Sequence, residues 1–425
     1  MFIERKVLYV IKSIKLRIYP NKTQLKIINN TLYACNFVKN KYLEYNINNH
    51  ISGEKFVTGC NFINHVTKLK KEDINYLWLK GISGIAIQEA ILSKEKAYKD
   101  FFNNKRGFPK FKSRKRINKE SYYFINQNHT YHISKNSIVL PKLKKIRITN
   151  GNLLPDESSI ISGRIIRHYD KYYVLFIYIE ENDNKDIIKN DIKLGIDLGV
   201  KDYAIIYDGF KCHHYKHFKD YDTYKKYYNR IKELQRIISK KVKYNYGKLL
   251  NEYLDKYHKE PSEKEKRIME GKAYNSFNIQ RIFNKINRIR VKLTNIRDNF
   301  IKQLVNKLTA RIKPMKINIE GLDISNMIED NDTSHKLHRL VSESNFYKFR
   351  MHLINKCIEY SIKLRLIDTY YPSTKLCSNC GHKNNHIRLI DRTYVCDKCG
   401  LIMDRDENAS INIYNCKSKY YEEIA

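Results

Sequence analysis

Residues 193–209, with the sequence KLGIDLGVKDYAIIYDG, decide the fold class of the chain. Apolar residues alternate in the first half and run together in the second, which predicts two strands joined by a tight turn. Gly195 and Gly199 permit another backbone to approach closely. Asp197 stands inside the first strand, where an acidic side chain rarely stays without a partner. The stretch therefore predicts the sheet of an α/β domain and a candidate functional carboxylate.

Two further carboxylates have similar surroundings. Glu320 ends the strand-like run KINIE, and Asp406 opens a helix-like stretch whose small residues permit tight packing. Taken singly, each acid is typical of a turn or a helix cap. A few carboxylates that hold divalent cations are, however, the usual means of activating water for phosphodiester hydrolysis. Together with Asp197, they predict a metal site of that kind on a very basic chain.

Four cysteines form two CxxC pairs separated by fifteen residues: Cys377, Cys380, Cys396 and Cys399. This spacing presents four thiolates to one tetrahedral Zn²⁺, and a glycine directly after each pair suits the tight turns of a zinc ribbon. Four thiolates leave no open position for water, so the predicted zinc is structural. The other cysteines are scattered and the total of nine is odd. This pattern argues against a secreted disulfide scaffold and for a reducing compartment.

Charge indicates a polyanionic partner. The 425 residues include 81 Lys and Arg against 45 Asp and Glu, a formal net charge of +36. An AT-rich genome would supply some of the lysine, but it does not easily explain that imbalance, so nucleic acid is the leading partner. A hydrophobic content of 42% excludes a disordered basic tail. Lysines interrupt the apolar start of the chain, so we expect neither a signal peptide nor a membrane span, and a soluble, intracellular protein.

A basic and aromatic run, FPKFKSRKR at 108–116, is the candidate nucleic-acid contact. Its cations would bind phosphates and its phenyl rings would stack on bases, although solvated basic loops are also common. The candidate cations are Lys110, Lys112, Arg114, Lys115 and Arg116.

The rest of the chain divides into two kinds of pattern. Alternation predicts a strand at 10–19 that ends at Pro20, and several short strands within 121–180 that suit a small β-barrel or a sandwich. A polar stretch at 181–191 marks a boundary. Helical periodicity covers 22–48, as one or two helices, and then 85–102, 221–244 and 276–312, and the stretch 245–275 is less periodic.

Several motifs occur together in a recognisable order: GIDLGVKDYAIIYDG, INIEGLDISNM, YYPSTKLCSNCGHKN, YVCDKCG and DRDENASINI. They resemble the three RuvC-like motifs of the transposon-encoded TnpB (OrfB-type) family, with the family's zinc ribbon just before the third. IKLRIYPNKTQ, GFPKFKSRKR and IVLPKLKKIRI resemble segments of its N-terminal half. The resemblance covers nearly the whole chain, and 245–275 is longer than usual for the family.

The resemblance implies a multidomain α/β fold in which an RNase H-like (RuvC) nuclease domain contains an inserted zinc ribbon. A helical recognition lobe and a small β-barrel, wedge-like module would precede it. The implied ranges are 1–21 and 107–190 for the wedge-like module, 22–106 for the recognition lobe, and 191–425 for the nuclease domain, with a helical insertion at 219–312 and the zinc ribbon at 374–402.

The activity that the resemblance implies is that of an RNA-guided, metal-dependent DNA endonuclease encoded by a mobile element. A guide RNA from the element would pair with double-stranded target DNA. Asp197, Glu320 and Asp406 match the family's nuclease carboxylates and would hold catalytic Mg²⁺, whereas Asp404 would be a neighbour. Databases often label such proteins as probable transposases. We expect a monomer without membrane contact, in the cytoplasm or nucleoid of a prokaryote or encoded by a virus.

Two alternatives remain at the level of sequence. The first is a guided DNA-binding protein that no longer cleaves. The second is a transposase that joins DNA strands, which would need a nucleophilic tyrosine and a pair of histidines. His213 and His214 lie among tyrosines, but none of these stands out as a nucleophile.

Overall fold

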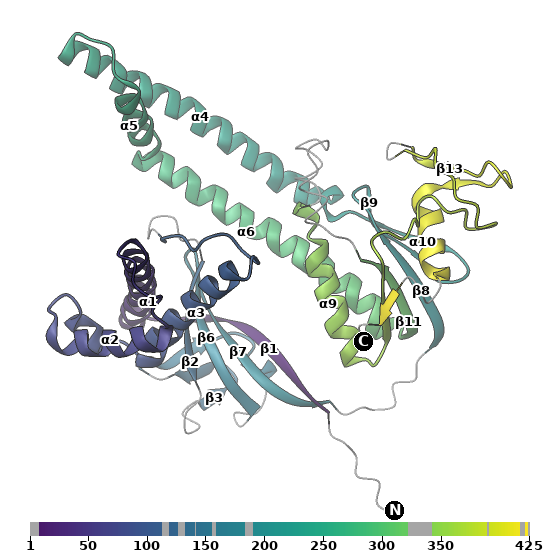
Figure 1. The fold of residues 1–425 in the computed structure, drawn as a ribbon, viewed down its shortest axis with the longest axis horizontal. Helices are drawn as coiled ribbons and strands as arrows, with labels where there is room; N and C mark the ends of the chain where they lie inside the picture. The colour runs from purple at the N-terminus through teal and green to yellow at the C-terminus, as the bar shows by residue number, and fades with distance from the viewer. Residues whose placement is uncertain are drawn as a thin grey trace, which may run out of the picture. The chain divides into compact units, whose positions relative to one another are not determined.

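The computed structural model describes residues 8–112, 119–125, 132–140, 142–154, 159–182, 190–321, 342–388, 391–416 and 421–423. Contacts within the chain define two compact units, Met1–Asp183 and Asn184–Ala425. Figure 1 shows their elements. In the described part of the chain, every helix is too short or too polar to cross a bilayer.

The first unit contains one seven-stranded sheet in the order β2-β6-β7-β1-β5-β4-β3, with antiparallel pairing throughout. Its strands are β1 (Leu8–Tyr19), β2 (Lys119–Ile125), β3 (His132–Ser134), β4 (Ser137–Leu140), β5 (Lys144–Ile148), β6 (Ile160–His168) and β7 (Lys171–Asn182). The predicted strand that ends at Pro20 is thus confirmed as β1. The described strands of this unit form one sheet and not the two separate sheets of a sandwich, so the alternative of a sandwich is wrong.

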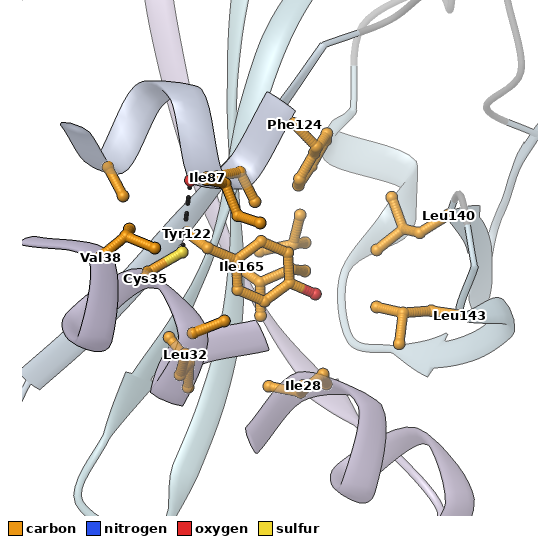
Figure 2. Packing of buried hydrophobic residues seen from close by; sticks show 14 of the residues in the cluster. Ile28, Leu32, Cys35, Val38, Ile87, Tyr122, Phe124, Leu140, Leu143 and Ile165 are labelled. Carbon is orange, nitrogen blue, oxygen red and sulfur yellow. Dashed lines mark hydrogen bonds between the residues drawn. The ribbon is translucent and has the colours of Figure 1, made fainter. Parts of the chain in front are cut away.

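Two helices, α1 (Lys22–Ile51) and α3 (Gly84–Phe102), pack on this sheet, and α2 (Gly59–Glu72) packs against α3. Side chains of α1 and α3 share one apolar core with the strands (Figure 2), where Cys35 donates a hydrogen bond to the Ala86 carbonyl oxygen at 3.3 Å. Asn21 and Gln24 form a capping box that fixes the start of α1, directly after Pro20. The pattern at 22–48 is therefore a single helix, and α2 is a helix that periodicity did not predict.

The second unit contains a six-stranded sheet in the order β10-β9-β8-β11-β12-β15. Its strands are β8 (Asn190–Leu198), β9 (Asp202–Tyr207), β10 (Cys212–Lys216), β11 (Pro314–Glu320), β12 (Lys363–Ile367) and β15 (Tyr421–Glu423). β8, β9 and β10 pair antiparallel, whereas β11 is parallel to both β8 and β12. The sheet is therefore mixed, and with its helices it confirms the predicted α/β class.

Helices cover both faces of this sheet. Because side chains alternate along a strand, Leu194 and Ile196 share one face of β8, where they join a core with α6 (Phe277–Asn306) and α9 (Phe346–Glu359). Gly195 and Asp197 lie on the opposite face, against α10 (Arg405–Asn415). Figure 1 shows α10 beside β8 and β9.

Between β10 and β11 the chain forms a long helical hairpin of α4 (Asp222–Tyr257), α5 (Glu263–Tyr274) and α6 (Figure 1). α4 and α6 share an apolar core of their own that includes Ile231, Ile238 and Ile286. A π-helical turn at Lys307–Arg311 follows α6. A short ladder of β13 (Thr393–Val395) and β14 (Ile402–Asp404) completes the described strands.

The helical pattern at 221–244 ends too early: α4 continues to Tyr257, and α5 fills much of the less periodic stretch. This part buries few apolar residues, so it has little periodic signal. Polar contacts hold it instead. Tyr253 donates to Glu265 at 2.9 Å, and Asn245 donates to the Ala273 carbonyl oxygen at 3.2 Å. A capping box at Ser262 fixes the start of α5.

Candidate functional site

Asp197 lies in the central strand β8, between β9 and β11. Its side chain is buried beneath α10. The neighbouring Gly195 explains how α10 comes so close, because a Cβ at position 195 would lie 2.5 Å from the Ser410 carbonyl oxygen and 2.6 Å from Tyr414. Only glycine fits this contact without displacing the helix.

Glu320 is the last residue of β11, the parallel neighbour of β8. Ile319 pairs with Ile196, so the following residues, Glu320 and Asp197, lie at the same level where both strands approach their ends. Burial raises the pKa of Glu320 to about 7. Two acids remote in sequence are therefore brought to the same end of two neighbouring strands, and we call this end of the sheet the acidic edge.

Asp406 lies in the first turn of α10. Asp404 caps this helix, because its Oδ1 accepts hydrogen bonds from the backbone N–H groups of Asp406 at 2.8 Å and Glu407 at 3.2 Å. The Asp406 carboxylate pairs with Arg405 at 2.7 Å and with Arg392 at 3.7 Å. Asp404 thus stabilises the first turn of α10 as its N-cap.

The three carboxylates interact electrostatically. Burial raises the pKa of Asp197 well above its ordinary value, and the negative charges of Glu320 and Asp406 raise it further, whereas Arg405 lowers it. Such repulsion among acids that are buried or half-buried is relieved when a cation binds between them. Carboxylate oxygens are also the ligands that Mg²⁺ prefers, so the donor set fits that ion.

The four predicted zinc cysteines converge. Among the described residues, Cys377, Cys380, Cys396 and Cys399 are the one group of three or more potential ligands whose ligand atoms all lie within 4.8 Å of one another. The Sγ atoms of Cys377 and Cys399 are 3.6 Å apart, as are those of Cys380 and Cys396. A zinc tetrahedron with bonds of about 2.3 Å has edges of about 3.8 Å, so the geometry fits Zn²⁺.

The surroundings of the thiols suit a cation as well. Gly381 and Gly400 both have φ of +71°, the left-handed conformation that each knuckle turn requires. The backbone N–H of Leu401 is the main cause that lowers the pKa of Cys399 to about 6, which favours its thiolate form. The carboxylate trio does not reach the same spacing, since it is absent from the groups within 4.8 Å.

The basic run is described in part. The backbone of Lys112 exchanges two hydrogen bonds with the Asn40 side chain, at 3.0 and 3.1 Å, and Lys94 donates to the Lys110 carbonyl oxygen at 2.9 Å. These bonds fix the segment to α1 and α3 and leave the side chains of Lys110 and Lys112 exposed. The other candidate cations, Arg114, Lys115 and Arg116, lie outside the described residues.

Two histidines near the acidic edge are bound to carboxylates. His214 contacts Asp202 at 3.0 Å and Glu407 at 2.8 Å, and these hydrogen bonds raise its pKa. His213 faces Asp208 at 2.7 Å. The two imidazoles therefore face different carboxylates.

Sequence reasoning missed the side chains that hold α10 in place. Asn318 of β11 donates to the carbonyl oxygens of Ile413 at 2.9 Å and Tyr414 at 3.2 Å. Asn408 and Asn412 are buried and donate to backbone carbonyls near the first cysteine pair. The available signal was that asparagines stand in otherwise apolar runs, NIE and NASINI, where a buried amide needs partners.

Comparison with known proteins adds two family models. "Helix-turn-helix domain" (HTH_OrfB_IS605) matches residues 10–55, which in this structure hold β1 and α1. "Cas12f1-like, TNB domain" matches residues 346–413, from α9 to α10.

Relatives match most of the chain. A Streptomyces pristinaespiralis protein named "Putative RNA-guided DNA endonuclease" is 24% identical over 95% of this chain and 88% of its own length. "TnpB-like protein L770" of Acanthamoeba polyphaga mimivirus is 26% identical over 95% of this chain and 72% of its own length. A solved CRISPR-Cas12f ternary complex is 14% identical over 96% of this chain and 100% of that one, with a TM-score of 0.38, too low to support a conclusion. The family models and relatives confirm the resemblance to the TnpB (OrfB-type) family.

Proposed function

We propose that this chain is an RNA-guided, divalent-metal-dependent DNA endonuclease of a mobile element. One observation carries the proposal: Asp197, Glu320 and Asp406, from three separate segments, interact at one edge of a sheet on a chain with net charge +36. The names of the relatives support the guided activity. The strand order supports an RNase H-like domain, because β8, β9 and β10 form an antiparallel meander and β11 and β12 continue the sheet in parallel.

In this proposal the three carboxylates would hold Mg²⁺, which when bound would activate water and stabilise the leaving oxygen of a phosphodiester. Asp197 and Glu320 stand on neighbouring strands and are therefore held rigidly. Asp406 stands in the first turn of a helix, and its carboxylate pairs with two arginines. Arg405 brings a positive charge close enough to Asp197 to lower the pKa of its carboxyl group.

The rest of the molecule would bind the nucleic acids. We assign the sheet of the first unit to the wedge-like module and α1–α3 to the recognition lobe, with Lys110 and Lys112 as phosphate contacts beside Arg114, Lys115 and Arg116. The four-cysteine cluster would hold a structural Zn²⁺, since all four positions are filled by sulfur. Guide RNA would select the target by base pairing, and the protein would bind its backbone.

The test compares Asp197→Asn with Asp191→Asn in protein purified with RNA encoded beside its gene. Both replacements lie on β8, but Asp191 is exposed and Asp197 is buried. With a guide-matched duplex and Mg²⁺, we expect Asp197→Asn to cut at least about 10³-fold more slowly at unchanged target affinity, because a metal ligand is lost. Asp191→Asn should cut like the wild type.

Equal cutting by Asp197→Asn and wild type would refute the assignment. Tight, guide-dependent binding by a wild type that does not cut in any divalent metal would favour the silent DNA-binding alternative. A covalent protein–DNA adduct would favour strand transfer.

A further inference from the structure

The cysteine cluster and the acidic edge are joined through α10. The strand β14, which belongs to the ladder beside the second cysteine pair, runs directly into this helix at Arg405. Its last residue, Asp404, caps the helix turn that carries Asp406. The chain thus passes from the zinc cluster to the candidate metal ligand within a few residues.

The first cysteine pair contacts the same helix from the side through two buried amides. Asn408 accepts a hydrogen bond from the Ser378 N–H at 2.9 Å and donates to the Leu376 carbonyl oxygen at 2.6 Å. Asn412, one turn later, donates to the same oxygen at 2.7 Å and to the Ser373 carbonyl oxygen at 2.8 Å. Ser378 lies inside the first CxxC pair, so these bonds reach the knuckle itself.

These contacts are specific in a way that simple packing is not. Asn408 is 0% exposed and Asn412 is 6% exposed, so water cannot replace a lost partner easily. Asn408 uses both its donor and its acceptor, whereas Asn412 is used as a donor to two carbonyl oxygens. A polar contact of this kind fixes the rotation and the height of a helix, while an apolar contact tolerates sliding.

We propose that Asn408 and Asn412 are positioning residues that make the cysteine cluster the support of Asp406. Asn408 lies two residues after Asp406, so a shift of α10 against the first knuckle moves the carboxylate by a similar amount. The inference rests on the proposed function, because it takes Asp406 to be a ligand of the catalytic cation. It assigns to the cysteine cluster a role in the geometry of the acidic edge.

The test measures Mn²⁺ binding to full-length protein from the electron paramagnetic resonance signal of free Mn²⁺. The variants are Asn408→Leu, Asn408→Asp and Asn412→Ala. Asn415→Leu is the control, because Asn415 is an exposed residue of the same helix. We expect Asn408→Leu and Asn412→Ala to weaken Mn²⁺ binding about ten-fold or more, as loss of residues that orient metal ligands does. Asn408→Asp keeps the acceptor for the Ser378 N–H but loses the donor to the Leu376 carbonyl oxygen, so it should weaken Mn²⁺ binding as well.

Two further readouts separate positioning from general damage. Zinc per chain should remain one in all variants, and target affinity should not change. Cleavage by Asn412→Ala should recover as Mg²⁺ is raised, because only the metal affinity is impaired. If Asn408→Leu loses zinc, the inference is tested by Asn408→Asp and Asn412→Ala alone.

The inference is overturned if Asn408→Asp and Asn412→Ala retain zinc and bind Mn²⁺ like the wild type. It is also overturned if their cleavage falls but does not respond to added Mg²⁺. The proposed function is tested separately by Asp406→Asn. If that variant binds Mn²⁺ and cuts as well as the wild type, the assignment of Asp406 fails, whatever the asparagine variants do.

Discussion

Replacing Glu320 by glutamine should stabilise the protein at alkaline pH and leave it unchanged in acid. Burial raises the pKa of Glu320 from 4.5 to about 7, so the folded protein takes up a proton that the unfolded chain does not hold between these values. Stability that is present below pH 4.5 is therefore lost as the pH rises through 7. Each pKa unit corresponds to about 1.36 kcal/mol, which makes the loss about 3 kcal/mol.

Glu320→Gln removes the charge at nearly constant shape, so it should recover that free energy at pH 8. It also lowers the pKa of Asp197, because the repulsion from Glu320 ends. For a unit of this size the gain corresponds to a rise in Tm of roughly 6–12 °C. The assay is thermal unfolding at pH 4.5 and pH 8 in Mg²⁺-free buffer without chelator, and zinc per chain is measured at both pH values because protons compete with zinc for the thiolates.

Glu260→Gln is the control, since Glu260 is exposed in the connection between α4 and α5. It should change Tm little at either pH. Added Mg²⁺ should raise the Tm of the wild type more than that of Glu320→Gln. An equal effect of Glu320→Gln at pH 4.5 and pH 8 would show that the carboxyl group is not held neutral by burial.

Gly195→Ala should destabilise the protein by about 1–3 kcal/mol, because the new Cβ would lie 2.5 Å from the Ser410 carbonyl oxygen. Its control is Gly247→Ala inside α4, where the new Cβ meets open space, and this replacement should stabilise the protein by about 0.5–1 kcal/mol. Denaturant unfolding measures the free energy of unfolding of both variants. If both replacements changed it in the same direction, the close packing of α10 on Gly195 would be contradicted. Cys396→Ser should reduce zinc measured by mass spectrometry from one per chain to near zero, and retained zinc would show that the four thiols do not form one site. Replacing Lys110 and Lys112 together by glutamine should weaken binding to guide RNA and to unrelated duplexes alike, and should reduce the slope of log affinity against log salt by roughly 0.9 for each lost phosphate contact. An unchanged slope would mean that these two lysines do not touch phosphates.

The local patterns predicted the central strands and the separate members of the candidate site. Alternation and apolar runs located β8 and β9, and the run KINIE ended at Glu320 as β11 does. The cysteine spacing predicted a cluster that the structure brings together. Each of these signals depends on residues a few positions apart, which is the range over which strand period, turns and metal spacing act.

Contacts between distant segments were beyond these rules. The pairing of Asp406 with Arg392, the contact of His214 with Glu407, and the two amides of α10 depend on the fold that brings distant residues together. The helical nature of 245–275 was also missed, because polar bonds rather than an apolar stripe hold α5 against α4. Gly195 was predicted to allow a close approach, but α10 as the approaching element emerged only from the structure.

The α4–α6 hairpin has a consequence for how the second unit folds. β8 must pair with β11, and the whole hairpin lies between them in the chain. Closing a flexible loop of that length would cost entropy that grows with the logarithm of its length. The hairpin, however, has its own apolar core and can form first.

Once formed, it returns the chain to its starting place, since the rings of Tyr221 before α4 and Phe300 near the end of α6 lie 6.0 Å apart. When β8 and β11 then come together during folding, the inserted segment behaves as a short loop between them. Its length in residues would slow folding little, whereas loss of its core, by Ile238→Ala or Ile286→Ala, should slow the assembly of the sheet.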